Sequence, residues 1–242
     1  MKFLLLLLSA GKLGKVLVSG GSMLLSVVAY AFVYGWRYAA GFVGLIFVHE
    51  MGHFLAARQR GLKVGAPTFI PFVGAWIELK EQPRDVETEA WIGLAGPLLG
   101  SIGALACYFA ARATGRDWLL ALSYAGFFLN LFNLVPLSPF DGGRITAVLT
   151  PRIWLLGVPV LGALFLWQPS PLLVLMVILA LPQVVKAWRY EANDPVHKAY
   201  YAASLETRVA YGLYYLGLVA FLAVMAHDTH DMLRPLQHAG GA

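Results

Sequence analysis

Three polar side chains within five positions have the types and spacing of a metal centre. His49, Glu50 and His53 form a His-Glu-x-x-His pattern. Residues four apart on a helix lie on one face, so the two imidazoles can bind one metal ion side by side. Glu50 lies on the neighbouring edge, where its carboxylate can act as general base toward a metal-bound water. The pattern therefore predicts a metal site with hydrolytic chemistry.

The surrounding residues argue against a chance match on a surface helix. The pattern lies inside an otherwise apolar run from Ala39 to Ala57. An ionisable side chain at membrane depth costs about 2.5–3.5 kcal/mol unless it is paired or functional. A bound metal ion accounts for three polar side chains in such a helix.

The composition of the chain is that of a membrane protein. Of its 242 residues, 59% are hydrophobic and 13% are charged, whereas soluble domains carry about 25% charged residues. The net charge of +5 comes from basic residues scattered among the loops, which favours a membrane topology over a nucleic-acid partner. We therefore expect an all-α polytopic membrane protein, a single integral domain over 1–242 with the lipid bilayer as a partner.

The apolar runs predict about seven transmembrane helices, because about 20 residues cross the hydrocarbon core. Their expected ranges are 16–36, 39–57, 90–111, 118–135, 145–167, 171–187 and 208–226. On this basis residues 1–38 form an N-terminal segment and first span, 39–150 a catalytic core, and 151–242 the C-terminal spans and tail.

Four segments outside these spans are given other structures. Residues 64–79 are rich in aromatic and β-branched residues with interspersed Gly and Pro, which predicts membrane-embedded strands or a hairpin after the second span. Residues 1–15 and 186–208 are expected at the membrane interface, the latter as a helix. The tail from His227 onward is expected to be loose.

The basic residues indicate an orientation. With the N-terminus in the cytoplasm, 14 of the 18 Lys and Arg residues lie inside, leaving Arg37, Arg112, Arg116 and Arg234 outside. This bias follows the positive-inside rule. It places the His-Glu-x-x-His turn in the cytoplasmic half of its span, on the same side as Asp141.

Asp141 is the best candidate for a third ligand, since catalytic zinc takes three protein ligands and leaves one position open. It follows a helix broken by Pro136 and Pro139, and Gly142 and Gly143 allow close backbone approach. The alternative is an ordinary turn aspartate. A second cluster, His227-Asp-Thr-His-Asp, could also bind metal, although a solvated tail is the better interpretation.

Two motifs together carry a family resemblance. His49-Glu-Met-Gly-His53 and Asn133-x-x-Pro136-x-x-x-x-Asp141-Gly-Gly resemble the site-2 proteases, the intramembrane zinc metalloproteases of peptidase family M50. The Gly96-Pro97 element between them also resembles the core of that family. The similarity covers residues from about 39 to 150.

The resemblance implies one Zn²⁺ bound by His49, His53 and Asp141, with Glu50 as base and Asn133 binding or polarising the substrate. It also implies that 64–79 holds an extended substrate. The expected reaction is cleavage in or near the transmembrane segment of a membrane protein, for regulated intramembrane proteolysis or membrane-protein clearance. Two rival interpretations are a non-catalytic zinc-binding chaperone or adaptor for transmembrane helices, and a metal transporter.

The chain departs from many members of the family in one respect. It contains no stretch long or polar enough for a PDZ or CBS domain. Regulation by such a domain is therefore missing or supplied by a membrane partner. The short loops and the charge bias favour a prokaryotic plasma membrane, with an organelle membrane as the alternative.

Overall fold

The computed structural model describes residues 2–239, and their side chains from 17 to 234. In this part of the chain the helices and strands are, in order, α1 Lys2–Tyr34, α2 Trp36–Gln59, β1 Thr68–Ile70, β2 Gly74–Trp76, α3 Val86–Thr114, α4 Asp117–Asn133, α5 Asp141–Thr146, η1 Pro151–Ile153, α6 Trp154–Trp167, α7 Pro171–Trp188, α8 Pro195–Tyr200 and α9 Leu205–Ala239.

Within the described residues, five helices are long and apolar enough to cross a membrane. They are Leu17–Tyr34, Trp36–Gln59, Val86–Thr114, Pro171–Trp188 and Leu205–Arg234. Large apolar side chains point outward from the bundle; Phe32 is 87% exposed and Leu166 is 84% exposed, as expected for surfaces that contact lipid. The predicted class, an all-α polytopic integral membrane protein, is confirmed.

Two of the seven predicted spans are shorter than expected. The helix α4 has 17 residues and α6 has 14. The predicted span 145–167 is interrupted, because α5 ends at Thr146 and a 3-10 turn at Pro151–Ile153 precedes α6. Proline cannot continue an α-helix from the preceding turn, and the Thr150 side chain caps the new turn by accepting from the Arg152 N–H.

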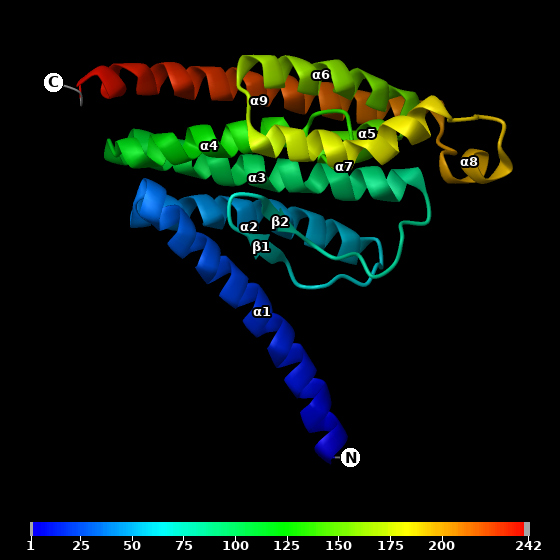
Figure 1. The fold of residues 1–242 in the computed structure, drawn as a ribbon, viewed down its shortest axis with the longest axis horizontal. Coiled ribbons are helices and arrows are strands. Elements are labelled where there is room, and N and C mark those ends of the chain that lie inside the picture. The colour runs from blue at the N-terminus through cyan, green and yellow to red at the C-terminus, as the bar shows by residue number, and fades with distance from the viewer. Residues whose placement is uncertain (1, 240–242) are drawn as a thin grey trace.

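The long helices form a stack in which neighbours in the sequence also pack together. Figure 1 shows α2, α3, α4 and α9 lying side by side, with α1 leaving the bundle diagonally toward its N-terminus, and α6 packs against α7. The largest core cluster joins α3, α4 and α9 and includes Leu94, Phe127 and Leu222, each no more than 2% exposed. The second and third helices of this stack, α3 and α4, therefore provide the rigid wall against which α2 is held.

The predicted hairpin is present between α2 and α3. The strands β1 and β2 pair antiparallel with Phe69 opposite Ala75, and an isolated bridge joins Val64 to Leu79. In the described residues β1 and β2 form a sheet of two strands, so the outer edge of β2 is not paired with another strand.

Hydroxyl groups of α1 bind the backbone of this hairpin. Ser22 Oγ accepts the Phe69 N–H at 3.2 Å, and Tyr30 Oη accepts the Phe72 N–H at 3.2 Å. Backbone groups without partners are costly in an apolar environment. The helix α1 therefore supplies hydrogen-bond acceptors for two backbone N–H groups of the hairpin.

The regions outside the spans are largely helical, and one expectation for them, the loose tail, was wrong. Residues 2–15 continue α1 without a break, and 186–208 contains the end of α7 at Trp188, the short helix α8 and the start of α9 at Leu205. The segment from His227 to Ala239 is the end of α9 rather than a loose tail. Side-chain pairs one turn apart favour this helix. Asp231 Oδ2 lies 3.4 Å from His227 Nε2, and Asp231 Oδ1 lies 3.7 Å from Arg234 Nη1.

Candidate metal centre

Two histidines of α2 meet on the buried face of that helix. His49 and His53 are 4% and 8% exposed, and their Nε2 atoms are 3.1 Å apart. The spacing of four residues on one helix produces this approach. The wall opposite is α3, where Gly96 has no side chain and so leaves room for the His53 ring.

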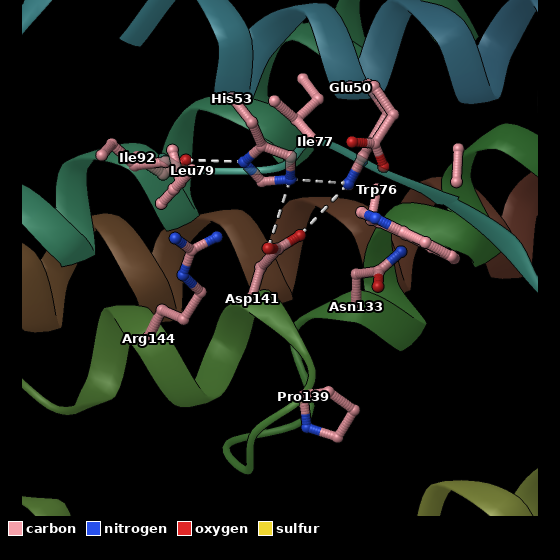
Figure 2. A pocket seen from close by; sticks show the side chains of 12 residues that line it. Glu50, His53, Trp76, Ile77, Leu79, Ile92, Asn133, Pro139, Asp141 and Arg144 are labelled. Atoms are coloured by element: carbon pink, nitrogen blue, oxygen red, sulfur yellow. Dashed lines mark hydrogen bonds and ion pairs between the residues drawn. The ribbon is translucent and has the colours of Figure 1, made fainter. Parts of the chain in front are cut away.

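Asp141 reaches the same point from another part of the chain. Its Oδ2 lies 3.2 Å from His49 Nε2, and its Oδ1 lies 3.3 Å from His53 Nε2. Figure 2 shows the Asp141 carboxylate directed at His53, with Asn133 and Arg144 on either side. The structure thus brings together the three side chains that the sequence analysis grouped as ligands.

The glycines after Asp141 explain how α5 comes so close to the end of α4. A Cβ on Gly142 would lie 2.2 Å from the Leu134 carbonyl oxygen. A Cβ on Gly143 would lie 2.3 Å from the Ser138 nitrogen. Only glycine fits at these two positions, and the tight turn between α4 and α5 places Asp141 over the histidines.

The Nδ1 atoms of both histidines are occupied. His49 Nδ1 lies 2.8 Å from Asn130 Oδ1, and His53 Nδ1 lies 2.7 Å from the Ile92 carbonyl oxygen. Because a carbonyl oxygen only accepts, Nδ1 of each ring carries the hydrogen in a neutral imidazole. Each Nε2 then presents a lone pair to the other and to Asp141.

This donor set suits a tetrahedral metal ion. Two Nε2 lone pairs and a carboxylate within 3.1–3.3 Å of one another contain no hydrogen-bond donor while both imidazoles are neutral. Ligand atoms about 2.0–2.1 Å from a tetrahedral zinc ion lie roughly 3.3–3.4 Å apart. The three residues therefore fit such an ion by both chemistry and spacing.

Glu50 lies beside these ligands and is itself buried. It is 6% exposed, and together with His49 and His53 it offers ligand atoms within 4.8 Å of one another. All three line a cavity of about 150 Å³. The remaining wall includes Ala75 and Trp76 of β2, so the hairpin faces the carboxylate of Glu50 across the same space.

Asn133 lines the cavity but does not contact the histidines through any hydrogen bond among the described residues. Its Nδ2 donates to the Leu129 carbonyl oxygen at 3.0 Å. A primary amide has two N–H groups. One of them therefore remains for a molecule in the cavity.

The sequence analysis missed two residues of the site. Asn130 binds His49, as described above, and Arg144 lines the cavity and lies 3.9 Å from Glu89 through its Nε. Asn130 had a detectable signal: it is a polar residue at membrane depth, three positions before Asn133 and on the same helical face. Arg144 was considered only as a topology marker.

The second candidate cluster does not contribute to this centre. His227 and Asp231 lie in the C-terminal half of α9 and pair with each other. Among the residues that the structure describes, His49, Glu50 and His53 are the group of three or more His, Cys, Asp or Glu side chains placed to hold a metal.

Comparison with known proteins agrees with the motifs. Residues 37–116 match the model of peptidase family M50. A zinc metalloprotease of Methanocaldococcus jannaschii is 34% identical over 109 residues, 43% of this chain and 31% of that protein. The zinc metalloprotease Rip3 of Mycobacterium tuberculosis is 31% identical over 134 residues, 50% of this chain and 33% of that protein.

Over this segment the chain is similar to peptidase family M50, which agrees with the resemblance of its motifs to the site-2 proteases. The matched segments span about a third of the length of these curated relatives. Among solved structures, the site-2 protease from Methanocaldococcus jannaschii is similar over 69% of this chain and 85% of that one, with 22% identity and a TM-score of 0.43.

Proposed function

We propose that the protein is an intramembrane zinc metalloprotease that hydrolyses a peptide bond in or near the transmembrane segment of a membrane-protein substrate. One observation carries this proposal. His49 and His53 lie with Glu50 on a helix apolar enough to span a membrane, and Asp141 of α5 converges with the two histidines within 3.1–3.3 Å. The metal named in the M50 relatives, zinc, suits these ligands.

His49, His53 and Asp141 would hold the ion. When bound, zinc acts as a Lewis acid that lowers the pKa of a coordinated water toward about 7 and polarises a carbonyl group. Glu50 takes a proton from the attacking water and passes it to the leaving amine. The remaining N–H of Asn133 is available to donate to the developing oxyanion.

The hairpin supports the binding of an extended substrate. Ala75 and Trp76 of β2 line the cavity, and the edge of β2 away from β1 is not paired with a strand of the described chain. A transmembrane helix must unwind before its peptide bond can be attacked, which frees backbone groups in an apolar environment. Pairing with β2 would satisfy these groups.

The charge bias of the loops supports a cytoplasmic N-terminus and a site that opens toward the cytoplasm of a prokaryotic cell. The physiological role is regulated intramembrane proteolysis or clearance of membrane proteins. This proposal includes a regulatory membrane partner that selects the substrate.

The test compares membrane fractions of cells that carry the wild-type chain, Glu50→Gln or His49→Ala, by mass spectrometry of membrane-protein fragments. We expect a single-pass protein or its trimmed stub to accumulate with both variants and its cut form to appear only with the wild type. Identical fragments in wild type and Glu50→Gln, with a phenotype only in His49→Ala, would overturn hydrolysis in favour of a zinc-dependent chaperone.

A further inference from the structure

We propose that Asn130 is a positioning residue that holds the His49 ring in the orientation and tautomer that metal binding requires. The inference rests on the proposed zinc site. It adds a residue outside both sequence motifs, since Asn130 belongs neither to His49–His53 nor to the segment that begins at Asn133.

The amide of Asn130 is bound at both ends, and this fixes its orientation. Its Nδ2 donates to the Gly126 carbonyl oxygen at 2.7 Å, an atom that only accepts. The opposite atom, Oδ1, therefore faces His49 Nδ1 at 2.8 Å. An oxygen at that place requires a hydrogen on Nδ1, which leaves the lone pair on Nε2, the atom that faces Asp141.

The amide of Asn130 is buried against a glycine of α3, which leaves space for it. Asn130 is 1% exposed in an apolar helix, where an unpaired amide is costly. A Cβ on Gly100 of α3 would lie 2.3 Å from Asn130 Oδ1. A leucine at position 130 would fill a buried site without needing a hydrogen-bond partner. We therefore attribute the amide at this position to its hydrogen bond with His49.

The two histidines differ in how they are held. His53 is oriented by a main-chain oxygen, that of Ile92, which no substitution at that position removes. His49 depends on a side chain from another helix. Hydrogen bonds to the second nitrogen of a ligating histidine typically change metal affinity or activity by about 10–100-fold. A single substitution outside the ligands, at Asn130, can therefore free the His49 ring to rotate.

The experiment measures zinc affinity of the purified full-length chain in detergent, by competition with a chromogenic chelator. We expect Asn130→Leu to weaken zinc binding by about 10–100-fold. Asn130→Asp keeps an acceptor oxygen for His49 Nδ1 but loses the donor to the Gly126 carbonyl oxygen, so zinc affinity should fall less than in Asn130→Leu. Asn133→Leu is the matched control: it removes the amide one turn further along α4 and should leave zinc affinity unchanged while lowering turnover.

A second readout separates positioning from general damage. The visible spectrum of the Co²⁺-substituted protein reports the ligand geometry, and it should change in Asn130→Leu and not in Asn133→Leu. Wild-type zinc affinity and an unchanged cobalt spectrum in folded Asn130→Leu would overturn the proposal. If that variant does not fold, Gly100→Ala provides the test, because the added methyl displaces the Asn130 amide from His49.

These outcomes do not depend on proteolysis. A chain that binds zinc, loses it in Asn130→Leu and yields the same membrane fragments as Glu50→Gln would support the positioning role and reject the proposed protease function. A chain that cleaves its substrate in a manner dependent on Glu50 but binds zinc equally well in Asn130→Leu would do the reverse.

Discussion

Gly96 of α3 lies directly against the imidazole of His53. A Cβ built on Gly96 would be 2.3 Å from both Cε1 and Nε2 of that ring. Real contacts at this distance do not occur, so the absence of a side chain at position 96 is a condition for the present place of His53. The relationship links helix packing to the metal centre, because Nε2 is also the atom that faces Asp141.

Gly96→Ala is therefore expected to weaken zinc binding even though no ligand is changed. Overpacking a buried site usually costs about 1–3 kcal/mol, and here the strain falls on His53. Zinc content after dialysis against a weak chelator measures the effect. Gly44→Ala is the control. Gly44 lies on α2, the helix that carries His53, and a Cβ there would meet no neighbouring atom within 4 Å. Equal zinc content in both variants would show that α2 and α3 adjust without moving the ring.

Substitution of a ligand is expected to lower zinc affinity, whereas substitution of the base is expected to lower turnover alone. Asp141→Ala removes a ligand and should lower zinc affinity by more than the roughly 10–100-fold typical of outer partners. Glu50→Gln should keep one zinc ion per chain and lose turnover by about 10²–10⁴-fold, the usual contribution of a general base. Metal analysis and a cleavage assay on the same samples test both expectations. Zinc loss in Glu50→Gln would make Glu50 a ligand rather than a base.

Removal and return of the metal provide a test without mutation. A strong chelator should abolish turnover of the wild-type chain, and added Zn²⁺ should restore it. Full activity after verified zinc removal would contradict the proposed role of the three ligands. Thermal unfolding should also shift downward on zinc removal, because a ligand that binds only the native state stabilises it.

Tyr200 connects the short helix α8 to the wall of the metal-site cavity. Its hydroxyl donates to Glu89 Oε2 at 2.5 Å, and Glu89 Oε1 lies 3.9 Å from Arg144, which lines the cavity. Burial and the neighbouring Glu89 carboxylate raise the pKa of Tyr200. The phenol therefore remains a protonated donor at neutral pH.

Tyr200→Phe should loosen this connection. Losing a bond to a partly exposed carboxylate costs about 1 kcal/mol, so amide hydrogen exchange in 190–204 should accelerate about fivefold. Tyr190→Phe is the control, because the structure gives the Tyr190 hydroxyl no hydrogen bond to the described residues while its ring packs on His197 and Tyr201. Equal exchange in the two variants would mean that ring packing alone holds α8.

The sequence predicted those parts of the site that depend on local geometry. The approach of His49 to His53 follows from helical spacing, and the position of Asp141 from the prolines and glycines around it. The contact between Asn130 and His49 could not be predicted in this way, because it joins residues 81 positions apart on two helices. Only the cost of a polar residue at membrane depth indicated that Asn130 needed a partner.

The errors in the fold have a similar origin. The polar composition after His227 predicts a loose tail, but side-chain pairs such as His227 with Asp231 stabilise a helix there. The apolar run 145–167 predicts one span, but Pro151 starts a 3-10 turn that interrupts it. Apolarity predicts membrane burial more reliably than it predicts where a helix begins and ends.

The attachment of the hairpin to α1 leads to a last prediction. Ser22→Ala combined with Tyr30→Phe removes the side-chain oxygens that accept the Phe69 and Phe72 N–H groups. Each such bond contributes about 1 kcal/mol, so amide exchange across 68–76 should rise by at least fivefold. Because β2 lines the cavity, KM for a transmembrane substrate should increase while zinc content stays constant.

Ser26→Ala is the matched control for this pair. Ser26 lies on the same helix, is 2% exposed, and its hydroxyl has no hydrogen-bond partner among the described residues. Its removal should leave exchange in the hairpin and KM unchanged, since a buried hydroxyl without a partner stabilises nothing. An increase in KM with Ser26→Ala as large as with the double variant would show that α1 acts through packing, and that its bonds to the hairpin do not position the substrate strand.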